Sequence, residues 1–456
     1  MKIKYIFIIF FLFCLLRPLL VLGQIHYIPN DPYFKYQTYL HNEYNNMEDL
    51  GYLPYYNYFK EHKKEILDKY KTIKGNLPVL AIIDSDYDPF DEDISNRLWK
   101  NSDEVPYNGV DDDGNGWVDD YMVMNFINQN VYRVSGGRSE TIEELGSSLY
   151  GTVYPPQGIF MSNPNYHGHY MALLAGAEQD NNIGYHGILP KEVKILTITV
   201  GHKENPNVTA NNIAIRDGLD YIVDMKSKGL INTVAVNMSF GTAFPSENYF
   251  GYDVTFGKGA FEEKLEQLNS SGINYIVAAG NEAHDIDIYS SYPAAFNQPN
   301  GIVVGAAANY NAIRAWSSNY GRNTVDIFTV AEKEEELFEY NYKTTKGFYL
   351  TIDDDINSSS SATAITSAVY TVASLLYPEC NNLQLKQLIL DSYMDKENLY
   401  GLTKAYNRVT HDGITRLSGE GRNELGNLIG LITKDVETGE QNYHLNVELR
   451  KKICGR

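Results

Sequence analysis

Five apolar runs of strand length recur along the middle of the chain, and they constrain its fold more than any other feature. Each run is apolar on both faces, as strands of a covered parallel sheet are. Helical patterns lie between the runs, so we expect an α/β domain with a mostly parallel central sheet and helices on both faces. The runs are Val79–Ile83, Val193–Val200, Thr233–Met238, Tyr275–Ala279 and Ile302–Ala308.

Six stretches are predicted to be helical. One of them follows Ser360, where apolar residues share one face at 3.6-residue spacing until Pro378 ends the helix. The other five are Tyr58–Lys71, His167–Ala177, Ala210–Lys228, Lys258–Ser270 and Leu383–Ser392.

Four polar residues stand at the ends of these elements, where open parallel sheets form their binding sites. Asp84 ends the first strand, His167 opens a helix, Asn281 follows the fourth strand and Ser360 begins the last long helix. Each has an ordinary explanation when taken alone, such as a solvated strand end, a turn or a helix N-cap. Their order along the chain is nevertheless the order of the subtilisin type of catalytic triad.

The segments around these positions resemble the motifs of the subtilisin-like (S8) serine peptidases, over about residues 30–393. LPVLAIIDSD, YHGHYMALLAGA, YIVAAGNEA and SSSSATAITSA are similar to the family's Asp, His, oxyanion and Ser motifs. The resemblance implies a three-layer subtilisin-like fold. It also implies that Ser360 is the nucleophile, His167 the general base, Asp84 the group that orients it, and Asn281 an oxyanion donor.

A further segment, VAVNMSFGT, resembles the strand with which the family binds its substrate. The resemblance implies that Ser239, Phe240 and Gly241 pair with an extended peptide by adding a strand to the sheet. A protein or peptide is therefore the expected substrate, and catalysis is expected to need no cofactor.

Several positions near the triad depart from the family pattern, and we expect no folding pro-segment between the signal peptide and the domain. Two functions therefore stay open: a serine endopeptidase, weak or narrowly specific, and a subtilase-fold surface protein that acts by binding. A metal-dependent hydrolase that uses His167 and His169 is a third hypothesis. The departures are Asp86 for Gly, His169 and Tyr170 for Thr and His, Ser358-Ser359 for Gly-Thr, Ser361 for Met, and Ala364 for Pro.

An acidic, Gly-rich insert separates Asp84 from His167. Its sequence, NGVDDDGNGWVDDY, alternates carboxylates along a turn that resembles the first part of an EF-hand loop without the final Glu. Such oxygen ligands suit Ca²⁺, so a structural calcium site is expected, and a solvated acidic loop is the alternative. The expected ligands are Asp111, Asp113, Asn115 and Asp119.

The start of the chain predicts its compartment. Lys2 and Lys4 precede an apolar run of signal-peptide length, and Gly23 lies at the end of a small-residue cleavage site. The protein is therefore expected to be secreted or at the cell surface, with no transmembrane anchor after signal removal. A signal anchor is the alternative reading of the same run.

The net charge of −20 argues against nucleic acid as a partner, because an acidic surface repels phosphates.

Cys380 and Cys454 could close one disulfide, but the sequence does not decide whether they do. The oligomeric state also stays open. The expected organisation is a signal peptide at 1–23, an N-terminal segment at 24–76, the peptidase domain at 77–395 and an acidic extension at 396–456.

Tyr is frequent, with 37 residues, and Asn, Ile and Lys recur, as in chains from AT-rich genomes. Together with the altered motifs, this composition is similar to that of malaria-parasite subtilisin-like proteins, those of the ookinete surface in particular. The resemblance implies a role in parasite invasion of host tissue.

Overall fold

The computed structural model describes a large part of the chain, and the fold is given for that part alone. The predicted signal peptide lies outside it. The described residues are 27–41, 50–85, 87–106, 108–126, 132–133, 167–200, 212–241, 254–307, 314–331, 341–343, 349–351, 358–391, 394–395, 420–422, 433–434, 441–442, 451 and 453–455.

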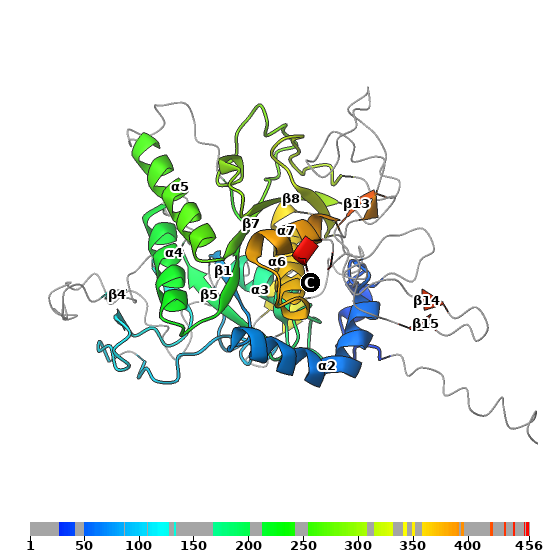
Figure 1. Ribbon diagram of the computed structural model, residues 1–456, viewed down its shortest axis with the longest axis horizontal. Helices are drawn as coiled ribbons and strands as arrows, with labels where there is room; N and C mark the ends of the chain where they lie inside the picture. The colour runs from blue at the N-terminus through cyan, green and yellow to red at the C-terminus, as the bar shows by residue number, and fades with distance from the viewer. Residues whose placement is uncertain are drawn as a thin grey trace, which may run out of the picture.

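A nine-stranded sheet in the order β12-β13-β9-β8-β7-β6-β1-β5-β3 forms the centre of the molecule (Figure 1). Neighbouring strands from β3 through to β13 are parallel, and β12 pairs antiparallel with β13. The strands are β1 (Val79–Asp84), β3 (Met124–Asn125), β5 (Lys194–Thr199), β6 (Thr233–Met238), β7 (Asn274–Ala278), β8 (Gly301–Ala307), β9 (Ile327–Val330), β12 (Met394–Asp395) and β13 (Glu420–Arg422).

Three short antiparallel pairs lie outside this sheet. They are β2 (Trp117–Val118) with β4 (Tyr132–Arg133), β10 (Asn341–Lys343) with β11 (Tyr349–Thr351), and β14 (Thr433–Lys434) with β15 (Gln441–Asn442).

The helices form layers on the sheet. Helix α3 packs against α6, and α4 packs against α5, which Figure 1 shows side by side. Every residue of β1, β6, β7 and β8 is buried, so both faces of the sheet are covered. The helices are α2 (Tyr52–Lys74), α3 (His167–Gly176), α4 (Asn212–Ser227), α5 (Val254–Ser270), α6 (Ser359–Leu376) and α7 (Asn382–Asp391), with 3-10 turns η2 (Phe34–Tyr36) and η4 (Ala294–Phe296).

This three-layer α/β arrangement confirms the predicted fold class. None of the helices in the described part of the chain has both the length and the apolar character needed to cross a bilayer. Helix α2 begins six residues earlier than predicted because tyrosines extend its buried face, among them Tyr52, Tyr55 and Tyr56. A tyrosine side chain can be buried when its hydroxyl finds a polar partner. The spacing of apolar residues in the sequence does not reveal a buried helix face of this kind.

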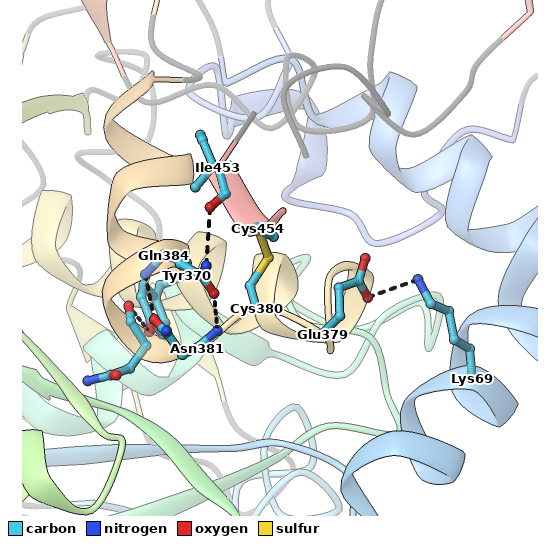
Figure 2. The surroundings of a disulfide bond; sticks show 9 residues. Lys69, Tyr370, Glu379, Cys380, Asn381, Gln384, Ile453 and Cys454 are labelled. Atoms are coloured by element: carbon cyan, nitrogen blue, oxygen red, sulfur yellow. Dashed lines mark hydrogen bonds and ion pairs between the residues drawn. A yellow bond between two sulfur atoms is a disulfide. The ribbon is translucent and has the colours of Figure 1, made fainter. Parts of the chain in front are cut away.

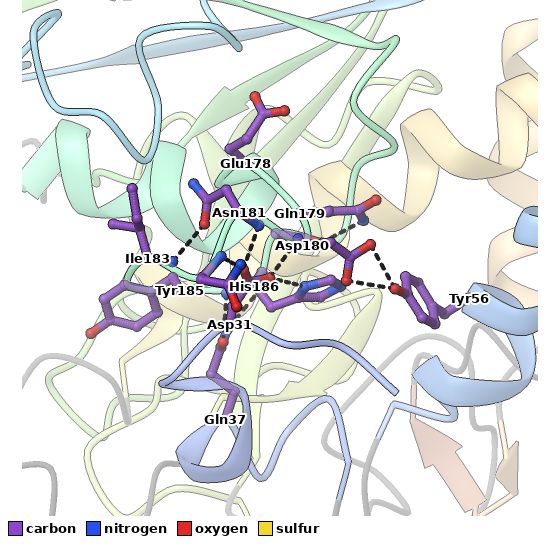
Figure 3. A network of polar contacts seen from close by, with 12 residues as sticks. Asp31, Gln37, Tyr56, Glu178, Gln179, Asp180, Asn181, Ile183, Tyr185 and His186 are labelled. Atoms are coloured by element: carbon purple, nitrogen blue, oxygen red, sulfur yellow. Dashed lines mark hydrogen bonds and ion pairs between the residues drawn. The ribbon is translucent and has the colours of Figure 1, made fainter. Parts of the chain in front are cut away.

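The N-terminal segment is attached to the domain by a buried polar network (Figure 3) as well as by core residues such as Phe34 and Leu40. The carboxylate of Asp31 accepts the backbone N–H groups of Asp180, Asn181 and Asn182 and pairs with His186 Nδ1 at 2.5 Å. Tyr52 of α2 contacts the other ring nitrogen of His186 at 2.7 Å. One buried His–Asp pair thus joins this segment, α2 and the loop after α3.

The end of the chain is tied back to the domain by a disulfide. Cys380, after α6, pairs with Cys454 with their Cα atoms 5.3 Å apart (Figure 2). Gln384 of α7 donates a hydrogen bond to the carbonyl of Ile453, next to the bridge. Because β13 also joins the central sheet, parts of the predicted C-terminal extension belong to the folded body.

Candidate active site

The predicted site residues gather at the carboxyl edge of the sheet. Asp84 is the last residue of β1, and Asn281 follows β7 in the same parallel sheet. His167 begins α3, and Ser360 lies in the first turn of α6. Because parallel strands end on one edge, these elements place their termini together.

Asp84 and His167 form a hydrogen-bonded pair. The Asp84 Oδ1 atom lies 2.7 Å from His167 Nδ1 and also accepts the N–H of Ser85 at 2.7 Å. An ionised carboxylate only accepts, so this contact places the imidazole proton on Nδ1 and leaves Nε2 as the basic nitrogen. The Asp84 side chain is 5% exposed and that of His167 19%, so the imidazole keeps some contact with solvent.

Gly168 makes this close contact possible. A Cβ atom at this position would lie 2.7 Å from the carbonyl oxygen of Ser85 and 2.9 Å from the Asp84 Cβ. Any side chain here would therefore push α3 away from the end of β1.

Helix α6 begins with a run of four serines, of which Ser358 is the N-cap. Its φ is −98°, a conformation open to any residue, so the loss of the family's Gly at this position causes no backbone strain. The Ser358 hydroxyl accepts the N–H of Ser361 at 3.3 Å. The interpretation of Ser360 as a helix cap is therefore wrong, because its neighbour already fills that role.

Ser360 has one free backbone donor and an engaged hydroxyl. In the first turn, the N–H of Ser359 goes to Asn281 and that of Ser361 to Ser358, whereas the N–H of Ser360 has no acceptor among the described residues. The Ser360 hydroxyl donates to the carbonyl of Ser239 at 3.0 Å, and the Ser239 hydroxyl donates back to the carbonyl of Ser360 at 2.9 Å.

Asn281 is exposed, and its amide is oriented by the start of α6. Its Oδ1 atom accepts the N–H of Ser359 at 2.8 Å. The amide nitrogen lies on the other side of the group and makes no hydrogen bond within the described residues. The side chain thus offers a free donor beside Ser360, the arrangement that an oxyanion hole requires.

Asn319 holds the loop that carries Asn281, and it is not among the site residues predicted from the sequence. Its Oδ1 atom accepts the N–H groups of Glu282 and His284, at 3.1 and 2.8 Å. Its Nδ2 atom donates to the carbonyl of Ala279 at 2.9 Å and to Glu282 Oε2 at 2.6 Å. Asn319 is 38 residues from Asn281 in the chain, and its role depends on a contact between loops that follow different strands.

His169 does not join His167 in a shared site. Its Nε2 atom lies 2.9 Å from Asp91 Oδ2, and its Nδ1 atom accepts the N–H of Asp88. The pair is buried, at 1% and 0% exposure, so both ring nitrogens serve to fix the loop after β1. The hypothesis of a two-histidine metal site has no support in this geometry, and Asp86 lies outside the described residues.

The predicted substrate strand is described in part. Ser239 is buried against Ser360, Phe240 is half-buried and Gly241 is exposed. A Cβ on Gly241 would approach Ser291 Oγ to 2.8 Å, so the chain passes closely over that residue. Residues 242–253, which follow this strand, lie outside the described part.

The insert places its predicted calcium ligands in two environments. Asp111 accepts the N–H groups of Asn115 and Gly116, and Asp119 accepts those of Asn108 and Gly109. These carboxylates therefore shape the loop itself. Asp113 accepts the N–H of Asn115, and the Asn115 side-chain amide donates to Asp113 and Asp120. These two carboxylates and that of Glu104 have oxygens within 4.8 Å of one another.

Comparison with known proteins identifies the family. The model of the subtilase family matches residues 75–421, which is more than half of the chain. A search of curated proteins finds no match. No comparison supports the narrower resemblance to malaria-parasite proteins.

Solved structures to which the chain is similar include three bacterial proteins. They are a protease of Pseudoalteromonas arctica (17% identity, 88% of this chain and 98% of the other, TM-score 0.49), the nisin leader peptidase NisP of Lactococcus lactis (16%, 80% and 93%, 0.49) and the epidermin leader peptide processing protease EpiP of Staphylococcus aureus (15%, 79% and 79%, 0.47). The family assignment rests on the family model and not on these distant similarities.

Proposed function

Because the chain belongs to the subtilase family, we propose that it is a serine endopeptidase with Asp84, His167 and Ser360 as its triad. The observation that carries the proposal is the 2.7 Å contact between His167 Nδ1 and Asp84 Oδ1, at the sheet edge where α6 presents Ser360. Protein or peptide chains are the proposed substrates.

The proposed reaction is acyl transfer. Ser360 Oγ attacks the peptide carbonyl while its proton passes to His167 Nε2, and the protonated imidazole then gives that proton to the leaving amine. Water hydrolyses the resulting ester with His167 again as the base, which restores the Ser360 hydroxyl. Asp84 holds the ring and stabilises its positive charge during both steps.

The negative charge that develops on the carbonyl oxygen needs two donors. The N–H of Ser360 is unpaired among the described residues, and the amide nitrogen of Asn281 is free beside it. The first donor belongs to the first turn of α6, and the second is on a side chain that hydrogen-bonds to that turn. At a helix N-terminus the helix dipole also stabilises negative charge.

The Ser360 hydroxyl has to turn before it can react. It now donates to the carbonyl of Ser239, so a rotation about χ1 is needed to direct its proton to His167 Nε2. An extended substrate that pairs with Ser239, Phe240 and Gly241 would compete for this carbonyl and release the hydroxyl. The contact thus supports a slow or substrate-activated enzyme.

Cleavage of a fluorogenic protein substrate tests the proposal. Wild-type protein should hydrolyse it, and Ser360→Ala should reduce the rate to background. Ser361→Ala is the matched control, because it removes a neighbouring hydroxyl from the same buried turn, and it should retain activity. Loss of activity in Ser361→Ala but not in Ser360→Ala would contradict the assignment.

A second candidate function is binding without catalysis at a cell surface, for instance in parasite invasion of host tissue. The mutual hydrogen bonds of Ser239 and Ser360 favour it, because they satisfy the hydroxyl that should react. A folded wild-type protein with no hydrolytic activity, and a Ser360→Ala variant that keeps its biological effect, would establish this alternative.

We also propose that residues 1–23 act as a signal peptide and that the protein is secreted or displayed at the surface. Lys2, Lys4 and the apolar run that follows them support this. Expression in a secretory host should release a chain that begins at Gln24, and retention of the uncleaved chain in the membrane would contradict it.

A further inference from the structure

A polar side chain lies in the middle of the central sheet, close to the proposed nucleophile. Asn237 belongs to β6, which pairs with β1, the strand that ends at Asp84, and with β7, the strand that precedes Asn281. Asn237 is fully buried, and a buried amide costs free energy unless its nitrogen and oxygen are hydrogen-bonded. Its partners therefore indicate why an amide is placed there.

The amide of Asn237 connects β6 to α6 through two serines. Its Nδ2 atom donates to Ser239 Oγ at 3.0 Å, and its Oδ1 atom accepts the hydroxyl of Ser367 at 3.1 Å. Ser367 lies about two helical turns after Ser360 in α6, so the two residues share one face of the helix. Ser239 is 3% exposed and Ser367 is fully buried, so water hardly reaches these bonds.

The Ser239 hydroxyl has one proton and two possible acceptors. The carbonyl oxygen of Ser360 lies 2.9 Å from Ser239 Oγ, and Oδ1 of Asn237 lies 3.3 Å from it. A hydroxyl can donate only one hydrogen bond at a time. Because Nδ2 of Asn237 donates to this hydroxyl, the proton is directed to Ser360, and each bond in such a chain strengthens the next.

The bond from Ser239 fixes Ser360 on its carbonyl side. The Ser360 hydroxyl in turn donates to the carbonyl of Ser239 at 3.0 Å, so the two residues are joined in both directions. Ser239 also begins the segment 239–241, with which an extended substrate is proposed to pair. The position of the nucleophile relative to the bound peptide thus depends on this contact, and a shift of about 1 Å can cost about 10²-fold in rate.

We propose that Asn237 is a positioning residue for the peptidase reaction: through the Ser239 hydroxyl it holds Ser360 in register with the substrate-binding segment. Because the role is defined for that reaction, it rests on the proposed function. The alternative is a purely structural link between the sheet and α6. The hydroxyls of Thr329 and Thr366, 2.7 Å apart, are such a link, because they join β9 to α6 without contacting Ser239.

Asn237→Asp tests the role, because it keeps the size of the side chain and replaces the Nδ2 donor by an acceptor. The carboxylate should draw the Ser239 proton away from the Ser360 carbonyl. With a fluorogenic protein substrate, kcat should fall about tenfold or more at alkaline pH, while KM stays near that of wild type. Burial favours the protonated carboxyl, which can donate to Ser239 again, so the ratio of variant to wild-type kcat should rise as the pH is lowered.

Two further variants separate positioning from stability. Asn237→Leu has no donor at any pH, so its kcat should be low and its ratio to wild type independent of pH. It buries no charge and carries the test if Asn237→Asp does not fold. Thr329→Val is the matched control, because it removes a buried hydrogen bond between β9 and α6. It should lower the Tm but keep the wild-type kcat.

A double-mutant cycle tests whether Asn237 acts through Ser239. Ser239→Ala should lower kcat, and adding Asn237→Leu to it should cause little further loss. Losses that multiply in the double variant would overturn the proposal, as would an Asn237→Leu variant with a lowered Tm and the wild-type kcat. An inactive wild-type protein would contradict the proposed function itself and this role with it, whereas an active wild type with unaffected variants would contradict this role alone.

Discussion

Single side chains around the start of α6 decide what the site can do. Asn281 turns its carbonyl oxygen to the Ser359 N–H, which directs its amide nitrogen outward. Asn281→Ala should lower kcat by about 10²–10³ with little change in KM, because the donor acts mainly in the transition state. Steady-state kinetics on the folded variant measure this, and an unchanged kcat would contradict the role.

Asn319 is a positioning residue, because it holds the loop that carries Asn281. Asn319→Ala removes four hydrogen bonds that hold residues 279–284. We expect kcat to fall by about tenfold or more, with KM nearly unchanged, because the oxyanion donor loses its orientation. Asn319→Asp keeps the acceptor and loses the Nδ2 donors, so it should not restore kcat. A variant that loses stability but keeps the wild-type kcat would show a purely structural role.

Some of these residues could be predicted from the sequence and others could not. Asp84, His167, Asn281 and Ser360 each lie at the end of an element with a clear apolar pattern, so their position at one sheet edge follows from the topology. The Ser239–Ser360 contact and the role of Asn319 join distant segments through side chains, and no local pattern encodes them.

At the scale of elements, long periodic segments could be predicted well and short ones could not. The five predicted strands and six predicted helices all form, with ends that shift by a few residues. Strands β3 and β13 have two and three residues, too few to show a period of two. The start of α2 could not be predicted because its buried residues are tyrosines, which occur on exposed as well as on buried helix faces.

The N-terminal segment contributes one fully buried ion pair, Asp31 with His186, to its attachment. Asp31→Ala would leave three backbone N–H groups and His186 without their acceptor. The variant should lose about 3–5 kcal/mol of unfolding free energy, as expected when one partner of a buried ion pair is removed. Denaturant unfolding measures the loss. Asp68→Ala, on the exposed face of α2, is the control and should change stability little.

At the scale of the whole molecule, the disulfide closes a loop of 74 residues between Cys380 and Cys454. The sequence left this pairing open, because it depends on where the end of the chain packs. Reduction should destabilise the fold by about 4 kcal/mol on the loop-entropy argument. Calorimetry with and without reductant tests this, with the Cys380→Ser/Cys454→Ser double variant as the control that should not respond to reductant.

For the molecule as a whole, the fold and the activity rest on different evidence. A three-layer subtilase body brings Asp84 and His167 into contact and places Ser360 at the start of α6, whereas the reaction depends on one hydroxyl that now contacts Ser239. The fold follows from the family and the structure, and the peptidase activity is our proposal.

Active-site labelling followed by peptide mapping tests that proposal most directly. A fluorophosphonate probe reacts only with a serine activated by its surroundings, so the folded wild-type protein should carry the label on Ser360. Ser360→Ala should not be labelled, and Ser359→Ala and Ser361→Ala should be. A correctly folded wild-type protein that takes up no label, or that takes it up on another serine, would contradict the account.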